Sequence, residues 1–173
     1  MTNPVHQRFA LHRSGAAICL AVVSMVAFAP IALGQDQSAA TGKDAIVARK
    51  TAMDTLSDRM DTIEAMIASG KKIDLDAAHM DADTISVFLM AFPHLFPAST
   101  NEWKPNVDKD PATDTFASPD VWSKFADFYR QSAAASKAAY DASRASDETV
   151  LKAAVARLRT ECNACHAAYL KMD

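Results

Sequence analysis

The sequence has little glycine, no nucleotide-binding loop and no excess of positive charge, and each absence excludes a class of protein. Only four of its 173 residues are glycine, which disfavours a turn-rich β fold. Neither a P-loop nor a Gly-x-Gly-x-x-Gly pattern occurs, so the chain offers no loop for nucleotide phosphates. With 18 basic and 21 acidic residues the formal net charge is −3, and we expect no binding to nucleic acid. Half of the residues are hydrophobic, so the sequence favours a packed helical domain.

The first 34 residues have the features of a secretory signal. Two arginines and no acidic residue precede an apolar run over 16–33, which ends in the small-x-small pattern Ala32-Leu33-Gly34. The run also reaches the lower length limit of a membrane-spanning helix, so an uncleaved anchor is the alternative, and only then do we expect membrane attachment. We predict a signal peptide over 1–34 and an exported domain over 35–173.

Apolar residues recur at alternating steps of three and four and predict four amphipathic helices. The first begins at a capping box formed by Thr41 and Asp44 and ends at Gly70. Asp74 caps the second, and Pro93 ends it. Four such helices without a strand pattern indicate an all-α fold, an antiparallel up-down-up-down four-helix bundle.

The second half of the bundle begins after a loop over 98–117. The Ser-Pro-Asp sequence at 118–120 predicts the start of the third helix, with Phe125 and Phe128 facing inward. Ser146 is expected to open the fourth helix. In this topology the loop lies at the end of the bundle where the fourth helix finishes.

The fourth helix contains Cys162-Asn163-Ala164-Cys165-His166, the attachment motif of a c-type haem. Positions i and i+3 share one face of a helix, so both thiols can form thioethers with one porphyrin edge. His166 then offers an imidazole to the iron from the same side. We predict one covalently attached haem c. The alternatives are a redox Cys-x-x-Cys pair and a zinc site, but the sequence lacks the βαβ pattern of the first and the second ligand pair of the other.

A second iron ligand has to come from another helix. Met53 lies in the inward seam of the first helix, about 15 Å from its start, and His166 lies about 9 Å from the chain end, which places both in a similar layer. Met60 lies deeper and Met90 is one position off its seam, so Met53 is the candidate, with a core-filling methionine as the alternative. Arg49 also occupies an inward position and needs a partner there. A haem propionate meets that need, and the alternative is an arginine reaching to solvent.

Over residues 40–173 the chain resembles the class II cytochromes c, the cytochrome c′ family. The attachment motif lies close to the C-terminus and is followed by Tyr169. Two further similarities are Asp44-Ala45-Ile46 leading to Arg49 and the Phe92-Pro93-x-Leu95-Phe96-Pro97 sequence. One departure is Leu170, where the family usually has a basic residue.

The resemblance implies a periplasmic bacterial haem protein with His166 as axial ligand and Arg49 beside a propionate. It also implies that Met53 is the second iron ligand, as in the low-spin branch of the family, which gives a one-electron carrier whose partners are redox proteins. The alternative is a high-spin, five-coordinate protein that binds nitric oxide or carbon monoxide, and a third hypothesis is a structural bundle with an unmodified dithiol. Family members often form homodimers through the first two helices, so a homodimer is one option. We expect no enzymatic turnover.

Overall fold

The first helix, α1, runs from Gly42 to Ala68 because the sequence marks both of its ends. In the computed structural model, which describes residues 41–171, the amide of Asp44 donates to Thr41 Oγ1 at 3.2 Å and the amide of Thr41 donates to the Asp44 carboxylate at 3.0 Å. The predicted capping box is therefore present. At the other end Gly70 has a φ of 68°, a conformation that glycine adopts without steric cost. The predicted signal peptide over 1–34 lies outside the described residues.

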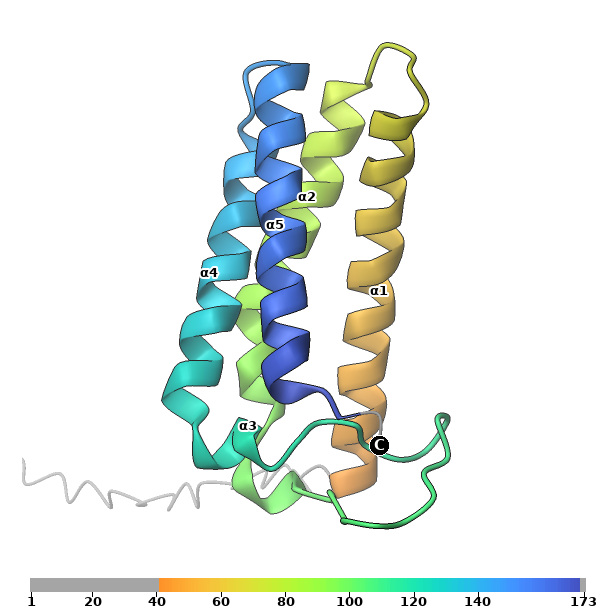
Figure 1. Cartoon of the computed structure of the whole chain (residues 1–173), viewed down its shortest axis with the longest axis vertical. Coiled ribbons are helices and arrows are strands. Elements are labelled where there is room, and N and C mark those ends of the chain that lie inside the picture. Colours follow the sequence, from red (N-terminus) through yellow and green to blue (C-terminus); the bar gives the residue numbers. More distant parts are fainter. Residues whose placement is uncertain (1–40, 172–173) are drawn as a thin grey trace, which may run out of the picture. The chain divides into compact units, whose positions relative to one another are not determined.

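Three further long helices complete the bundle that the sequence predicts. These are α2 (Leu75–Ala91), α4 (Phe125–Ser143) and α5 (Glu148–Tyr169). Between α2 and α4 lie the short turns η1 (Phe92–Leu95), η2 (Ala98–Thr100) and α3 (Asp120–Ser123). Figure 1 shows the four long helices alternating in direction, with the loop after η2 at the end where α5 finishes. The described residues form no β-strand, only an isolated antiparallel bridge between Ala117 and Leu170.

The start of the third helix differs from the prediction. Ser118 makes no side-chain cap, and its buried hydroxyl has no hydrogen-bond partner among residues 41–171. The helix breaks at Lys124, where φ is −119° and ψ is 37°, so α3 and α4 are separate. The break rotates the next residue away from the core, and Phe125 is 39 % exposed. The prediction that Phe125 faces inward was wrong, whereas Phe128 is buried as expected.

The fourth helix begins one residue later than predicted. The carboxylate of Asp147, not the hydroxyl of Ser146, caps α5 by accepting hydrogen bonds from the amides of Thr149 and Val150 at 2.8 and 3.0 Å. A carboxylate at this position satisfies two of the amides that a helix start leaves unpaired.

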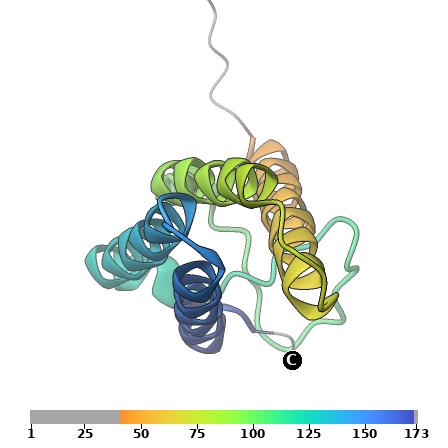
Figure 2. The same cartoon turned by 90° about the horizontal axis from the view of Figure 1, so that it is seen from above.

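The buried residues form two clusters. The aliphatic core fills the half of the bundle away from the loop, and its larger members are Leu56, Met60, Ile63, Ile85, Leu89, Leu151 and Leu158. The aromatic core lies at the loop end and consists of Ala52, Phe92, Phe96, Val121, Phe128 and Tyr169. Figure 2 shows the bundle end on, with α2 beside both α1 and α4 and with α5 beside α4. None of the helices over 41–171 combines the length and the hydropathy needed to cross a membrane.

Candidate functional site

Two cavities, of about 190 and 280 Å³, lie between α1 and α5. The outer cavity reaches the aromatic core and the loop, and the inner cavity reaches the aliphatic core. Five residues line both of them: Met53, Asp54, Phe92, Cys165 and His166. Because the two cavities share these walls, they form one groove whose total size falls within the range of small-molecule and cofactor sites.

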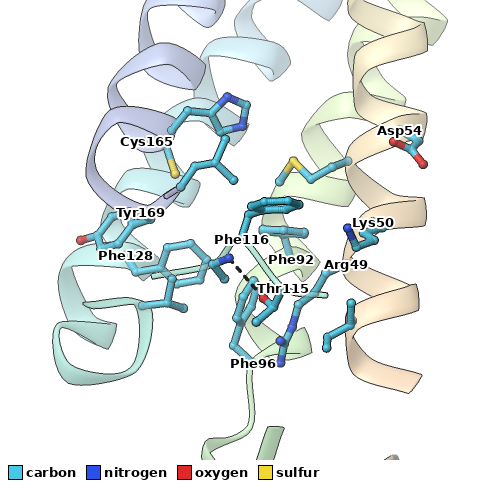
Figure 3. Close-up of a pocket in the computed structure, with 16 residues that line it drawn as sticks. Arg49, Lys50, Asp54, Phe92, Phe96, Thr115, Phe116, Phe128, Cys165 and Tyr169 are labelled. Carbon is cyan, nitrogen blue, oxygen red and sulfur yellow. Dashed lines mark hydrogen bonds between the residues drawn. The ribbon is translucent and has the colours of Figure 1, made fainter. Parts of the chain in front are cut away.

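The two cysteines of the motif lie on the groove side of α5. Both are free and half-buried, and Cys165 lines both cavities while Cys162 lines the inner one. Figure 3 shows the Cys165 sulfur on α5 above the aromatic side chains of the outer cavity. The i, i+3 spacing therefore presents both thiols to one space, as attachment of a single porphyrin edge requires.

The thiols do not have the properties of a redox pair. Burial raises the pKa of Cys162 above its ordinary value and raises that of Cys165 to about 11. Redox-active cysteines have lowered pKa values, because the thiolate is the reactive form. The zinc alternative also lacks support, since the described residues contain no group of three or more histidine, cysteine or acidic side chains that could hold a metal.

His166 follows Cys165 and lines both cavities from α5. Desolvation by the surrounding protein lowers its pKa, and the positive charge of Arg159 lowers it further. A lowered pKa keeps the imidazole neutral at physiological pH, and the neutral ring is the form that binds a metal. The side chain therefore lies in the groove in the neutral form that an axial ligand requires.

Among the methionines named as candidates, Met53 is the one whose side chain lines both cavities together with His166. Met60 is buried and lines only the inner cavity, whereas Met90 is 58 % exposed and lines neither. Two other histidines, His79 and His94, also lie outside the groove. The ring Nε2 of His79 lies 3.0 Å from the carbonyl oxygen of Ala145, and His94 is exposed. Binding of iron by Met53 remains a prediction.

Arg49 is buried at 5 % exposure and lines the outer cavity. Its Nε donates to the carbonyl of Leu95 at 2.8 Å, and its other nitrogens donate to the carbonyl and hydroxyl of Thr100. The guanidinium carbon lies 4.1 Å from the centre of the Phe96 ring, a cation–π distance. The alternative of an arginine reaching to solvent was therefore wrong.

The environment of Arg49 is short of negative charge. No carboxylate among the described residues forms an ion pair with Arg49, and burial lowers its pKa to about 10. A buried cation is costly unless an anion accompanies it. A cation of this kind on a cavity wall fits an anionic group of a ligand, such as a carboxylate at the edge of a haem. Contact with a propionate remains a prediction.

A strap of three residues, Thr115, Phe116 and Ala117, closes the outer cavity from the loop side. An antiparallel bridge ties it to the end of α5, with hydrogen bonds from the amide of Lys171 to the carbonyl of Phe116 and from the amide of Ser118 to the carbonyl of Tyr169, both 2.8 Å. Figure 3 shows the Phe116 ring among the side chains that line the cavity. The loop therefore lies at the predicted end, and this strap forms part of the groove wall.

Neither Lys50 nor Phe116, which both take part in this closure, was predicted from the sequence. Lys50 on α1 donates to the carbonyl of Pro111 at 2.6 Å, and its ammonium lies 5.1 Å from the centre of the Phe116 ring. Trp103, the other aromatic side chain of the loop, lines neither cavity. Leu170, where the sequence departs from the family pattern, pairs with the strap and lines the outer cavity.

Comparisons with known proteins agree with this geometry. The family model described as Cytochrome C′ matches residues 44–170. The fold is similar to that of cytochrome c prime from Shewanella frigidimarina, at 24 % identity and a TM-score of 0.63, over 75 % of this chain and 96 % of the other. For cytochrome c′ from Rubrivivax gelatinosus the identity is 24 % and the TM-score 0.63, over 76 % of this chain and 98 % of the other. For the nitric oxide complex of a mutant of cytochrome c prime from Alcaligenes xylosoxidans the identity is 20 % and the TM-score 0.64, over 76 % of this chain and 98 % of the other. Among curated proteins no sequence match is found.

Proposed function

Because the chain belongs to the cytochrome c′ family, whose members bind covalently attached c-type haem, we propose that it binds nitric oxide or carbon monoxide at a ferrous haem iron. In this proposal Cys162 and Cys165 would hold the haem through thioethers, and His166 would supply a nitrogen to the iron from α5. Residues of α1, including Met53, would line the space that the gas enters. Gas binding was the alternative prediction from the sequence, and the likeness to nitric oxide complexes of cytochrome c prime from Alcaligenes xylosoxidans supports it over a low-spin haem.

The observation that carries the proposal is the apolar lining of the groove on the α1 side. Met53, Leu56 and Phe92 form this wall, together with Ile85 and Leu89 deeper in the inner cavity. The hydroxyl of Ser132 also lines that cavity, but it donates to the carbonyl of Leu89 at 2.6 Å. Asp54, Ser57 and Arg159 add polar groups to this lining, which is otherwise mainly apolar. A mainly apolar distal pocket suits small neutral ligands that need no hydrogen bond from the protein.

The protein's own groups have distinct tasks in this site. His166 supplies a neutral nitrogen on one side of the groove, and Arg49 supplies a buried positive charge for a propionate. The strap and Lys50 exclude water at the outer edge. The haem supplies an iron that binds a diatomic gas, and the chain supplies its attachment, its charge balance and a dry pocket. We propose no substrate turnover, and we propose export to the periplasm, where members of this family occur.

A second candidate function is one-electron transfer through a haem with both His166 and Met53 on the iron. The observation that favours it is that Met53 shares both cavity walls with His166. Methionine and histidine together raise the reduction potential of a haem. In that case the partners are redox proteins.

Replacing Met53 separates the two candidates. Leucine has a similar volume, so Met53→Leu is expected to preserve the fold. For the gas-binding protein, the ferric wild type is high-spin, its ferrous form binds carbon monoxide, and Met53→Leu keeps both properties. Met60→Leu is the matched control, because Met60 lines only the inner cavity. Its spin state and its carbon monoxide binding are expected to match those of the wild type.

A different spectrum would contradict the gas-binding proposal. If the wild type is low-spin, shows the near-infrared band of a thioether–iron bond and loses it in Met53→Leu, the electron carrier is the function. Exported protein without any haem would leave the structural bundle with a free dithiol.

A further inference from the structure

Direct polar contact between α1 and α5 is concentrated on one side chain. Arg159 of α5 donates from Nε to Glu64 Oε1 at 2.8 Å and from Nη2 to Glu64 Oε2 at 2.6 Å. Its Nη2 also lies 3.6 Å from Asp61 Oδ1. Within the described part of the chain, no other hydrogen bond or ion pair joins these two helices. We refer to Arg159, Glu64 and Asp61 as the clasp.

The clasp lies at the inner end of the groove. Arg159 lines the inner cavity together with Cys162 and His166, and it precedes Cys162 by one helical turn. Along α5, His166 lies about 10 Å from Arg159, and along α1, Met53 lies about 16 Å from Glu64, at 1.5 Å per residue. The strap closes the outer end of the same groove. Met53 and His166 therefore face a space that is bounded by a polar contact at each end.

The geometry of the contact between Arg159 and Glu64 suits a role in setting the distance between α1 and α5. A guanidinium that binds one carboxylate through two nitrogens fixes the distance and the relative orientation of the two groups. Both side chains are 39 % exposed, so the pair contributes little to the overall free energy of unfolding. The same geometry can nevertheless bias the position of α1 relative to α5.

We propose that the Arg159–Glu64 pair is a positioning element that sets how closely Met53 on α1 approaches the iron side of His166 on α5. The inference rests on the proposed function, because it assigns to the clasp the control of the gas-binding face. With the clasp intact, Met53 is held over this face and restricts entry of the gas. Without it, α1 moves more freely and the face opens.

The test compares carbon monoxide association with the ferrous protein among clasp variants. Arg159→Gln and Glu64→Gln are each expected to raise the association rate constant about fivefold, the lower end of typical coupling between sites. The charge-swapped double variant Arg159→Glu/Glu64→Arg is expected to return it towards the wild-type value. Arg59→Gln is the matched control, because it breaks the 3.1 Å pair between α1 and Asp81 of α2, away from the groove.

A second measurement works without haem. Amide hydrogen exchange of α1 around Met53 is expected to become faster in both glutamine variants, in protein with or without haem, and to stay unchanged in Arg59→Gln. Exchange and association rates equal to those of Arg59→Gln would overturn the inference, and so would a swapped variant that behaves like the single ones. Failure of the proposed function can be distinguished from failure of this inference. In the first case the wild type itself lacks haem or does not bind carbon monoxide. If Met53 is on the iron, the inference predicts a weaker near-infrared band in the glutamine variants.

Discussion

Two helix pairs of the bundle pack in opposite ways: α2 and α4 lie close together, whereas α1 and α5 are separated by a groove. At the first, Ala135, Ala138 and Ala139 are buried, and Ser136 donates to the carbonyl of Ser86 at 2.8 Å. Small side chains let these two helices pack closely. Between α1 and α5, large side chains and the ion pair between the long side chains of Arg159 and Glu64 leave two cavities. The difference shows that the site arises because α2 and α4 pack closely while α1 and α5 are held apart.

The largest effect is expected from removing the attachment point in the open groove. Cys162→Ser/Cys165→Ser is expected to lose all covalently bound haem, since no thioether can form. Each single variant is expected to retain one thioether and attach haem less completely. Acid–acetone extraction followed by mass spectrometry measures the remaining haem. Haem that stays bound to the double variant under these conditions would rule out the attachment site.

Truncating the aromatic core is expected to cost stability as well as site geometry. Phe128 is 2 % exposed and its ring centre lies 5.0 Å from that of Phe96 and 5.2 Å from that of Tyr169. Phe128→Ala is therefore expected to lower the free energy of unfolding by about 3–5 kcal/mol, measured by urea unfolding. Phe125→Ala is the control, since Phe125 is partly exposed. An equal loss in both variants would contradict the observed break at Lys124.

Enlarging a residue of the closed interface is expected to have a smaller effect. Ala139 is fully buried on α4, and Ala139→Leu is expected to cost about 1–3 kcal/mol by overpacking. Ala133→Leu, at an exposed position of the same helix, serves as the comparison and is expected to change the urea midpoint little. An Ala139→Leu variant as stable as the wild type would mean that α2 and α4 do not pack closely.

The smallest expected effect is the loss, at acid pH, of the stability that the Arg159–Glu64 pair contributes. Hydrogen bonds from Arg159 lower the pKa of Glu64 below its ordinary value, so the unfolded chain binds the proton more readily than the folded one. The stabilisation is present above the unfolded pKa and is lost as the pH falls through the folded pKa. Because the pair is partly exposed, it contributes less than about 1 kcal/mol.

Urea midpoints measured at about pH 7 and about pH 3 reveal this contribution. Glu64→Gln is expected to reduce the difference between the two midpoints. Asp58→Asn removes an exposed acid of the same helix that forms no ion pair within residues 41–171, and it is expected to leave the difference unchanged. Equal behaviour of the two variants would show that Glu64 carries no pH-dependent stability.

Features that depend on neighbouring residues were predictable from the sequence. The capping box at Thr41, the end of α2 before Pro93 and the shared face of Cys162 and Cys165 all follow from spacings of three or four residues. The bundle follows from the repeat of apolar positions. Features that depend on how helices rotate against each other were not. The break at Lys124 carries no proline or glycine to mark it, and the pairing of Arg159 with Glu64 joins residues 95 apart in the chain.

The position of the strap was not predictable from the sequence either. Its position depends on the antiparallel bridge between Ala117 and Leu170, two residues whose side chains carry no pairing signal. The bridge depends on the bundle, which places the loop beside the end of α5. Phe116 could therefore not be distinguished in advance from Trp103 as the aromatic residue of the groove wall.

A crystal structure of the purified ferrous protein exposed to carbon monoxide would show whether this groove holds haem and gas. We expect one haem between α1 and α5, joined to the sulfurs of Cys162 and Cys165, with His166 on the iron from α5 and carbon monoxide on the side of Met53. An iron that carries the Met53 sulfur instead of the gas, or a groove without haem, would contradict this expectation.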